Sequence, residues 1–231
     1  MKKNKIFVMI IFLILLTSFQ FSFAKTLNKQ AYKTIKTYFV DDDKPSDFTS
    51  IQDAIDTANP GDSIYVKNGK YYENIVIDKS IDLIGENKYN TIIDGEIKTR
   101  FFKRSSTVIK VKTDYVNISN LTIQNATGID GRGIYFIKNK GMDISKNNTI
   151  KNNIIKNCSY GLMIVNPLNN TVSNNSFYNC CGGFFYPSLP YHKNIYENNS
   201  VNGKQILSLY NKENLTIEGD YGVITITDCR N

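Results

Sequence analysis

Residues 150–164 (IKNNIIKNCSYGLMI) recur 22 positions later, in residues 172–186 (VSNNSFYNCCGGFFY). After a further 24 positions, residues 196–203 (YENNSVNG) repeat the first half of the pattern. An earlier copy begins 32 positions before residue 150, and its ten extra residues fall in two connecting segments. Insertions confined to two places indicate a repeated structural unit whose connecting loops vary in length.

The apolar pieces of each repeat are short and β-branched, which favours strands over helix pairs. The period predicts an all-β fold, a right-handed parallel β-helix whose turns pair at about 4.8 Å. Two inward columns are expected: Ile118, Ile150, Val172, Tyr196, and Ile123, Ile155, Phe177, Val201. One corner is predicted to carry a ladder of Asn120, Asn152, Asn174 and Asn198. Asparagine suits this position because it tolerates left-handed backbone and can bond to the amide one turn away.

A short capping α-helix is predicted at about residues 50–58, where the apolar positions 51, 54, 55 and 58 share one helical face. Thr49 and Gln52 have the spacing of a capping box, and Pro60-Gly61 ends the helix. Such a helix would cover the core and the unpaired edge of the first turn.

Residues 1–24 have the pattern of a secretory signal, with Lys2, Lys3 and Lys5 before an apolar run and Ser22-Phe23-Ala24 at the cleavage site. The alternative is a retained membrane anchor. We expect cleavage, no permanent membrane span, a lead-in at 25–39, and a β-helix domain at 40–231. The predicted location is secreted, at the cell surface or in the periplasm.

The net charge of +7 includes the three lysines of this segment, which leaves +4 on the remainder. This mild excess predicts no nucleic-acid partner. Edge-to-edge self-association stays open, because no cap is evident at the C-terminal edge.

Residues 48–86 (FTSIQDAIDTANPGDSIYVKNGKYYENIVIDKSIDLIGE) and 91–95 (TIIDG) resemble the opening of pectin-lyase-like β-helix proteins. These include the pectinesterases, the periplasmic copper-binding accessory proteins of the nitrous-oxide reductase system, and adhesin-like surface proteins. The Asn-rich turns after residue 118 are more similar to the last two groups. The resemblance implies the fold over residues 40–227 and leaves the function open.

The catalytic segments of the enzymes in this superfamily are missing from the sequence. Residues 69–73 (GKYYE) resemble the GxYxE segment of pectinesterases, but the QDT-like, DFIFG-like and Arg-Pro-Trp segments are absent. Asp94 in TIIDG has no partner carboxylate recurring on later turns. We therefore predict no catalytic residue, metal or cofactor, and a structural role for Tyr71 and Glu73.

Cys158 and Cys180 lie 22 positions apart, so stacking would bring their Cα atoms within the range of a disulfide. A disulfide closing a loop of this length stabilises a protein by roughly 3 kcal/mol in the chain-entropy model. We expect a structural disulfide or plain buried thiols in preference to a metal site.

The loop that contains Arg100, Phe101, Phe102, Lys103 and Arg104 is a candidate ligand-binding segment for an acidic polysaccharide, although a solvated connector has the same composition. The sequence thus favours an exported, non-catalytic β-helix protein, adhesin-like or recognising a polysaccharide or cell-wall glycan. The alternatives are a diverged polysaccharide lyase or hydrolase, and a periplasmic copper-binding accessory protein.

Overall fold

The computed structural model describes residues 14–17, 34–43, 45–96, 106–126, 128–138, 143–180, 194–210, 212–214 and 216–227. The chain divides into two units, Met1–Ile35 and Lys36–Asn231. Of the first unit, residues 14–17 are helical. No helix in the described ranges has the length and hydropathy needed to span a membrane. Most of the predicted signal segment lies outside these ranges, so export stays a prediction.

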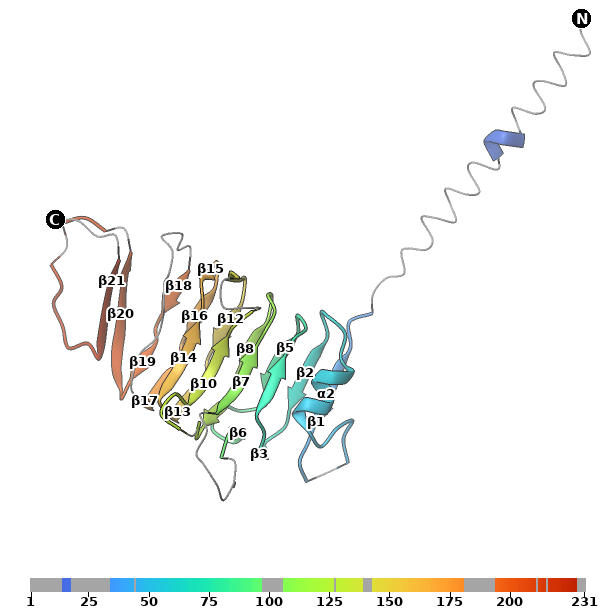
Figure 1. Cartoon of the computed structure of the whole chain (residues 1–231), viewed down its shortest axis with the longest axis horizontal. Coiled ribbons are helices and arrows are strands. Elements are labelled where there is room, and N and C mark those ends of the chain that lie inside the picture. Colours follow the sequence, from blue (N-terminus) through green and yellow to red (C-terminus); the bar gives the residue numbers. More distant parts are fainter. Residues whose placement is uncertain are drawn as a thin grey trace, which may run out of the picture. The chain divides into compact units, whose positions relative to one another are not determined.

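The second unit is a coil of short strands that form long parallel sheets (Figure 1). In the described part of the chain, a seven-stranded sheet has the order β1 (Thr37–Val40), β2 (Ser63–Val66), β5 (Asp82–Gly85), β8 (Asn117–Ser119), β12 (Thr149–Lys151), β16 (Thr171–Ser173), β18 (Ile195–Glu197). An eight-stranded sheet has the order β3 (Gly69–Tyr71), β6 (Thr91–Asp94), β9 (Thr122–Gln124), β13 (Ile154–Cys158), β17 (Ser176–Cys180), β19 (Ser200–Val201), β20 (Lys204–Tyr210), β21 (Val223–Thr227). A four-stranded sheet has the order β4 (Ile75–Ile77), β7 (Thr107–Val111), β10 (Arg132–Phe136), β14 (Tyr160–Ile164), and β11 (Ser145–Lys146) pairs with β15 (Pro167–Leu168).

The register of these sheets confirms the predicted parallel β-helix and its two inward columns. Ile118 pairs with Ile150, which pairs with Val172, and Val172 pairs with Tyr196. The second column, Ile123, Ile155, Phe177 and Val201, is likewise in register. The core lies inside the coil, because these positions and their counterparts in earlier turns are buried apolar residues, except that Tyr196 and Val201 in the last turn are half-buried.

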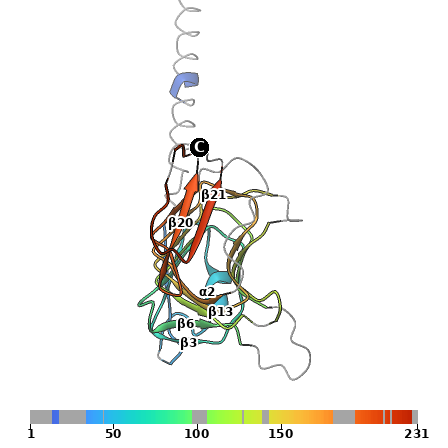
Figure 2. The same cartoon turned by 90° about the vertical axis from the view of Figure 1, so that its left-hand side faces the viewer.

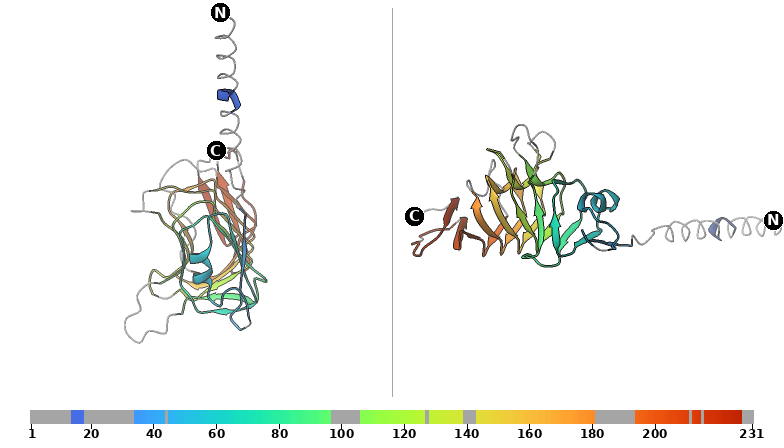
Figure 3. Two further views of the ribbon diagram at one scale, coloured as in Figure 1. Left: turned by 90° about the vertical axis from the view of Figure 1, so that its right-hand side faces the viewer. Right: turned by 90° about the horizontal axis from the view of Figure 1, so that it is seen from below.

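The predicted capping helix is α2 (Ile51–Thr57), which lies at the β1 end of the coil (Figure 3). It buries Ile51, Ala54 and Ile55. Its N-cap is Ser50, whose side chain accepts a hydrogen bond from the Asp53 backbone, and this corrects the predicted cap at Thr49. The carboxylate of Glu73 accepts hydrogen bonds from the Ile51 and Gln52 backbones at 2.8 and 2.9 Å. Glu73 therefore has the structural role expected for it.

The first strand begins inside the segment that was predicted to be an unstructured lead-in. β1 pairs in parallel with β2, and its Tyr38 and Phe39 rings meet Phe48 and Tyr65 edge to face. The backbone N–H of Phe39 donates to Asp47, which lies on the far side of β1 from β2. The lead-in boundary at residue 39 is thus corrected, because aromatic packing holds β1 against the first full turn.

Three corners of the coil carry residues with positive φ, at intervals of five positions. In one turn they are Asn147, Asn152 and Asn157, with φ of 57°, 55° and 55°. The corresponding residues in other turns are Tyr115, Asn120, Asn125, Asn169, Asn174, Asn179 and Asn198. Asparagine is favoured here because its short polar side chain tolerates the left-handed conformation.

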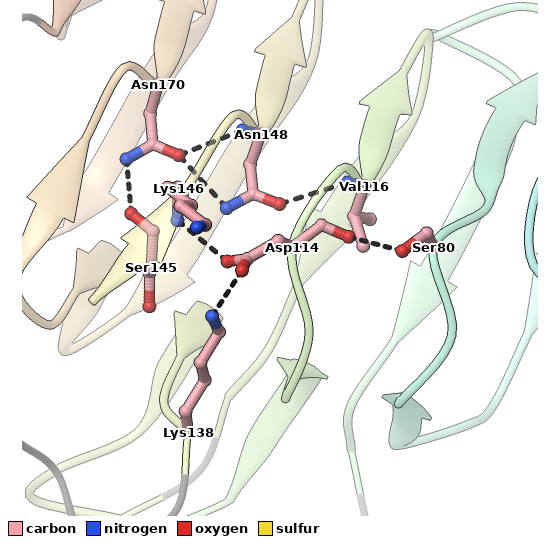
Figure 4. Close-up of polar contacts among 8 residues, drawn as sticks. All are labelled: Ser80, Asp114, Val116, Lys138, Ser145, Lys146, Asn148 and Asn170. Atoms are coloured by element: carbon pink, nitrogen blue, oxygen red, sulfur yellow. Dashed lines mark hydrogen bonds and ion pairs between the residues drawn. The ribbon is translucent and has the colours of Figure 1, made fainter. Parts of the chain in front are cut away.

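The residue after each of these corner asparagines is buried or half-buried, and at two corners it forms a buried ladder. Asn148 donates its backbone and side-chain N–H groups to Asn170 Oδ1 at 2.9 and 3.0 Å. Asn170 donates in the same way to Asn194, and its side chain also donates to the Ser145 carbonyl (Figure 4). The second ladder is Asn153, Asn175 and Asn199.

The predicted corner ladder of Asn120, Asn152, Asn174 and Asn198 is confirmed in its left-handed backbone, but the buried ladders are formed by other residues. In that column Asn152 Nδ2 donates to Asn120 Oδ1 at 2.6 Å, but Asn174 and Asn198 are exposed. A left-handed residue turns the chain, so its own side chain faces outward and the next residue enters the core. The buried ladder therefore lies one residue further along.

The last strands depart from the parallel pattern. β20 pairs antiparallel with β19, and β21 then pairs in parallel with β20 (Figure 2). The chain thus reverses direction at Asn202 and Gly203, which both have positive φ.

Candidate functional site

One face of the eight-stranded sheet gathers polar and aromatic side chains in register. Because successive residues of a strand alternate between faces, the residues next to the inward column face outward. Asp94 pairs with Gln124, Gln124 with Lys156, and Lys156 with Tyr178. We call Asp94, Gln124, Lys156 and Tyr178 the outer column.

Asp94 begins the outer column as a buried carboxylate whose side chain is 0% exposed. Lys70 Nζ lies 2.9 Å from Asp94 Oδ2, and Gln124 Nε2 donates to the same oxygen at 2.6 Å. Asn125 Nδ2 lies 3.0 Å from both carboxylate oxygens, and the Glu96 backbone donates to Oδ1 at 3.0 Å. The carboxylate is thus held by four donor groups.

These donors determine the charge of Asp94. Burial would by itself raise the pKa of its carboxyl group, but the hydrogen bonds from Lys70, Gln124, Asn125 and Glu96 outweigh this effect and lower the pKa. The hydrogen bond to Asp94 in turn raises the pKa of Lys70. At neutral pH the pair is therefore carboxylate and ammonium, and Asp94 has no proton to donate.

The solvent-accessible part of this face is aromatic and cationic. Lys70 Nζ lies 4.6 Å from the centre of the Tyr72 ring, and the Tyr72 side chain is 57% exposed. At the other end of the outer column Tyr178 is 39% exposed. Two exposed rings with lysines beside them can stack on flat, partly apolar ligand surfaces and attract negative charge.

The outer column does not supply a pair of carboxylates for general acid and base catalysis. The positions in register with Asp94 on the next three strands are an amide, an amine and a phenol. Glu96 follows two residues after Asp94 and is exposed. The carboxylate of this column, Asp94, is ionised and accepts hydrogen bonds from four groups, so the arrangement is better suited to binding than to proton transfer.

The predicted binding residues Arg100, Phe101, Phe102, Lys103 and Arg104 lie outside the described residues, so their role stays a prediction. Sequence reasoning considered Asp94 alone and missed Lys70, Gln124, Lys156 and Tyr178. A usable signal was present, since Tyr72 and Asp94 are 22 positions apart, as are Lys156 and Tyr178.

Cys158 and Cys180 are in register as predicted, and both are free thiols. Within the described ranges, the side chains of metal-ligating type that gather in a group of three or more are Asp41, Asp42 and Asp43, whose ligand atoms lie within 4.8 Å of one another. These ligands are carboxylate oxygens, which soft copper ions do not favour.

The family model for pectinesterases matches residues 37–149, a range that contains Asp94 and Gln124. Among solved structures, pectin methylesterase from Yersinia enterocolitica is 16% identical over 80% of this chain and 66% of its own, with a TM-score of 0.52. The chain has the fold of that esterase. Pectin methylesterase from carrot is 16% identical over 84% of this chain and 62% of its own, with a TM-score of 0.48.

Alginate lyase from Paenibacillus is 14% identical over 84% of this chain and 95% of its own, with a TM-score of 0.42. By contrast, this chain covers 62% of the carrot esterase and 66% of the Yersinia esterase, which is slightly less than two thirds of the length of each. No curated protein matches the sequence.

Proposed function

We propose that this is an exported, non-catalytic protein that binds an acidic polysaccharide along the outer column. The observation that carries the proposal is the position of Lys156, which lies in register between the amide of Gln124 and the ring of Tyr178. The only carboxylate of the column is buried and already paired with Lys70. A ligand on this face therefore meets positive charge, amide groups and aromatic rings.

A linear glycan fits the repeat of the fold. Neighbouring strands place their outer side chains about 4.8 Å apart along the coil, so one extended chain can contact several turns. Each contact is weak, and the affinity comes from their sum. The family model and the Yersinia structure both carry a name that refers to pectin, which makes pectin the first polysaccharide to test.

The binding test uses the purified protein with polygalacturonate, fully methyl-esterified pectin and neutral dextran, each measured by calorimetry at two salt concentrations. We expect binding to polygalacturonate that weakens with salt, because salt screens exposed charges. Lys156→Gln and Tyr178→Ala should each weaken binding about tenfold, the effect of losing roughly 1.4 kcal/mol.

Lys151→Gln is the matched control. Lys151 belongs to the same turn, but it is exposed on β12 in the seven-stranded sheet. Equal effects of Lys151→Gln and Lys156→Gln, or no binding of the unaltered protein to any of the three polysaccharides, would overturn the proposal.

The second candidate is a diverged polysaccharide lyase or hydrolase, favoured by the buried carboxylate of Asp94 and its four donors. Turnover of pectin or alginate, measured as new chain ends, would support this candidate if Asp94→Asn abolishes it. Adhesin-like attachment and a copper-accessory role remain predictions from the sequence. Metal analysis of the protein isolated from its native location tests the latter.

A further inference from the structure

The third corner of the coil replaces the asparagine ladder with two thiols. Asn157 and Asn179 have positive φ, and the residues that follow them are Cys158 and Cys180. The two cysteines are partners in the register of β13 and β17. They therefore stand where the other two corners place their buried ladder asparagines.

The sulfur of Cys180 also takes the position of a ladder amide toward the backbone carbonyl of the preceding turn. Cys180 Sγ lies 3.6 Å from the Ile155 carbonyl oxygen, 25 residues earlier, as Asn175 Nδ2 lies 2.9 Å from the Ile150 carbonyl oxygen, also 25 residues earlier. Cys180 Sγ also lies 3.4 Å from the Tyr178 carbonyl oxygen, and Cys158 Sγ lies 3.3 Å from the Lys156 carbonyl oxygen. The backbone thus holds both sulfurs on the same side of two adjacent turns.

The two thiols differ in exposure and in hydrogen bonding. Cys158 is 4% exposed, whereas Cys180 is half-buried. The interaction between the two side chains lowers the pKa of the Cys180 thiol and raises that of the Cys158 thiol. Cys180 is thus both the more accessible sulfur and the one whose thiolate is stabilised, which are the properties of an attacking thiol.

We propose that Cys158 and Cys180 form a thiol–disulfide exchange site that is oxidised by a low-molecular-weight disulfide. The Cys180 thiolate attacks one sulfur of that disulfide, forming a mixed disulfide and releasing one thiolate. Cys158 then loses its proton to solvent, and its sulfur attacks Cys180 Sγ, releasing the second thiolate. The two cysteines are oxidised to one disulfide, and the external disulfide is reduced to two thiols.

The register allows this product without a rearrangement of the coil. Paired residues on neighbouring parallel strands have Cα atoms about 4.8 Å apart, inside the range of about 4.4–6.8 Å for disulfides. The bond would join β13 to β17 two residues beyond Lys156 and Tyr178. The chemistry does not depend on polysaccharide binding, so either proposal can fail while the other stands.

The test uses the full chain with Cys181→Ser and Cys229→Ser, so that Cys158 and Cys180 are the only thiols. After incubation with oxidised glutathione, intact mass spectrometry should find the loss of two hydrogen atoms and no lasting adduct. Adding Cys158→Ser should trap one glutathione on Cys180. Adding Cys180→Ser instead should make adduct formation at least tenfold slower.

We call the chain with Cys181→Ser and Cys229→Ser the background protein. A second readout is its thermal unfolding midpoint, which should be higher in the oxidised than in the reduced form. A variant with serine at both positions should show no such difference, and circular dichroism checks that each variant is folded. Alanine replaces serine in any variant that does not fold. A stable glutathione adduct on the background protein, or equal adduct rates for Cys158→Ser and Cys180→Ser, would overturn the proposal.

Discussion

Asn175 Oδ1 accepts two hydrogen bonds from Asn153, one from its backbone N–H at 3.0 Å and one from its side-chain Nδ2 at 3.1 Å. Asn153 is 0% exposed and Asn175 is 1% exposed, so water cannot replace either bond. The amide column therefore satisfies a corner of the backbone that would otherwise be buried without partners. We therefore expect the ladder to contribute substantially to the free energy of unfolding of the coil.

Asn175→Ala should destabilise the protein by about 3 kcal/mol, because it leaves two buried donors of Asn153 without an acceptor. The free energy of unfolding, measured in urea, tests this. The control is Asn174→Gly at the preceding position, which is exposed and has a φ of 57°. Glycine accepts this conformation, so the control should cost only a few tenths of a kcal/mol. Equal costs would contradict a role for the ladder.

Tyr115→Asn should stabilise the protein by about 1 kcal/mol. Tyr115 has a φ of 58° and a side chain that is 62% exposed, at the corner where other turns have Asn147 and Asn169. The left-handed conformation is less favourable in free energy for a bulky residue than for asparagine. Tyr89→Asn, at a side chain that is 67% exposed, is the control and should have little effect. Thermal unfolding compares the two, and a lower midpoint for Tyr115→Asn would disprove the argument.

Glu73→Gln should weaken the attachment of α2 and cost about 1–2 kcal/mol. The carboxylate accepts hydrogen bonds from the backbones of Ile51 and Gln52 and from the Ser50 hydroxyl. Charge-assisted bonds to a helix N-terminus are stronger than those of a neutral amide. Hydrogen exchange of the α2 amides should accelerate relative to that of the β13 amides. Glu197→Gln, at an exposed position on β18, is the control that should leave both rates unchanged.

Asp94 should make stability depend on pH in the acid range. Because the pKa of Asp94 is lowered in the folded protein, its contribution is complete above the unfolded-state value of about 3.9. The contribution is lost as the pH falls through the lower folded-state value. At pH 7 Asp94→Asn should cost about 1–3 kcal/mol, and the loss is moderated because Lys70 is 41% exposed.

Unfolding midpoints from pH 7 to pH 2 test this relationship. The unaltered protein should lose stability more steeply below pH 4 than Asp94→Asn, so that the two curves converge in acid. Parallel curves would show that the pKa of Asp94 is the same in the folded and unfolded states, which would contradict this prediction.

The sequence predicts the stacking of the coil well and the corners less well. A 22-residue step is sufficient to align Ile155 with Phe177, because both must enter one core. The inward side chain at each corner depends on the φ of the residue before it, and repetition alone does not reveal that angle. The five-residue interval of Asn147, Asn152 and Asn157 contains the missing information, since it marks three successive turning points of the coil.

The binding face was less predictable for a related reason. Asp94 is held by Lys70 and Gln124, which come from two other turns. Lys70 is diagonal to Asp94, because its partner in the 22-residue register is Ile92, and Gln124 follows Asp94 by 30 residues. The alignment of early turns with late ones requires the lengths of the intervening loops. The register of β3 with β6 follows the 22-residue step, but that of β6 with β9 spans 30 residues and is supplied by the structure.

The spacing along the ladders has a consequence for how such a protein can change. Asn148 to Asn170 and Asn153 to Asn175 both span 22 positions, while Asn170 to Asn194 and Asn175 to Asn199 both span 24. The two additional residues therefore lie outside the five-residue interval between the two ladders, which is the same in each of these turns. Changes of length outside this interval leave both amide columns in register, so the coil can gain or lose residues there without losing a buried ladder.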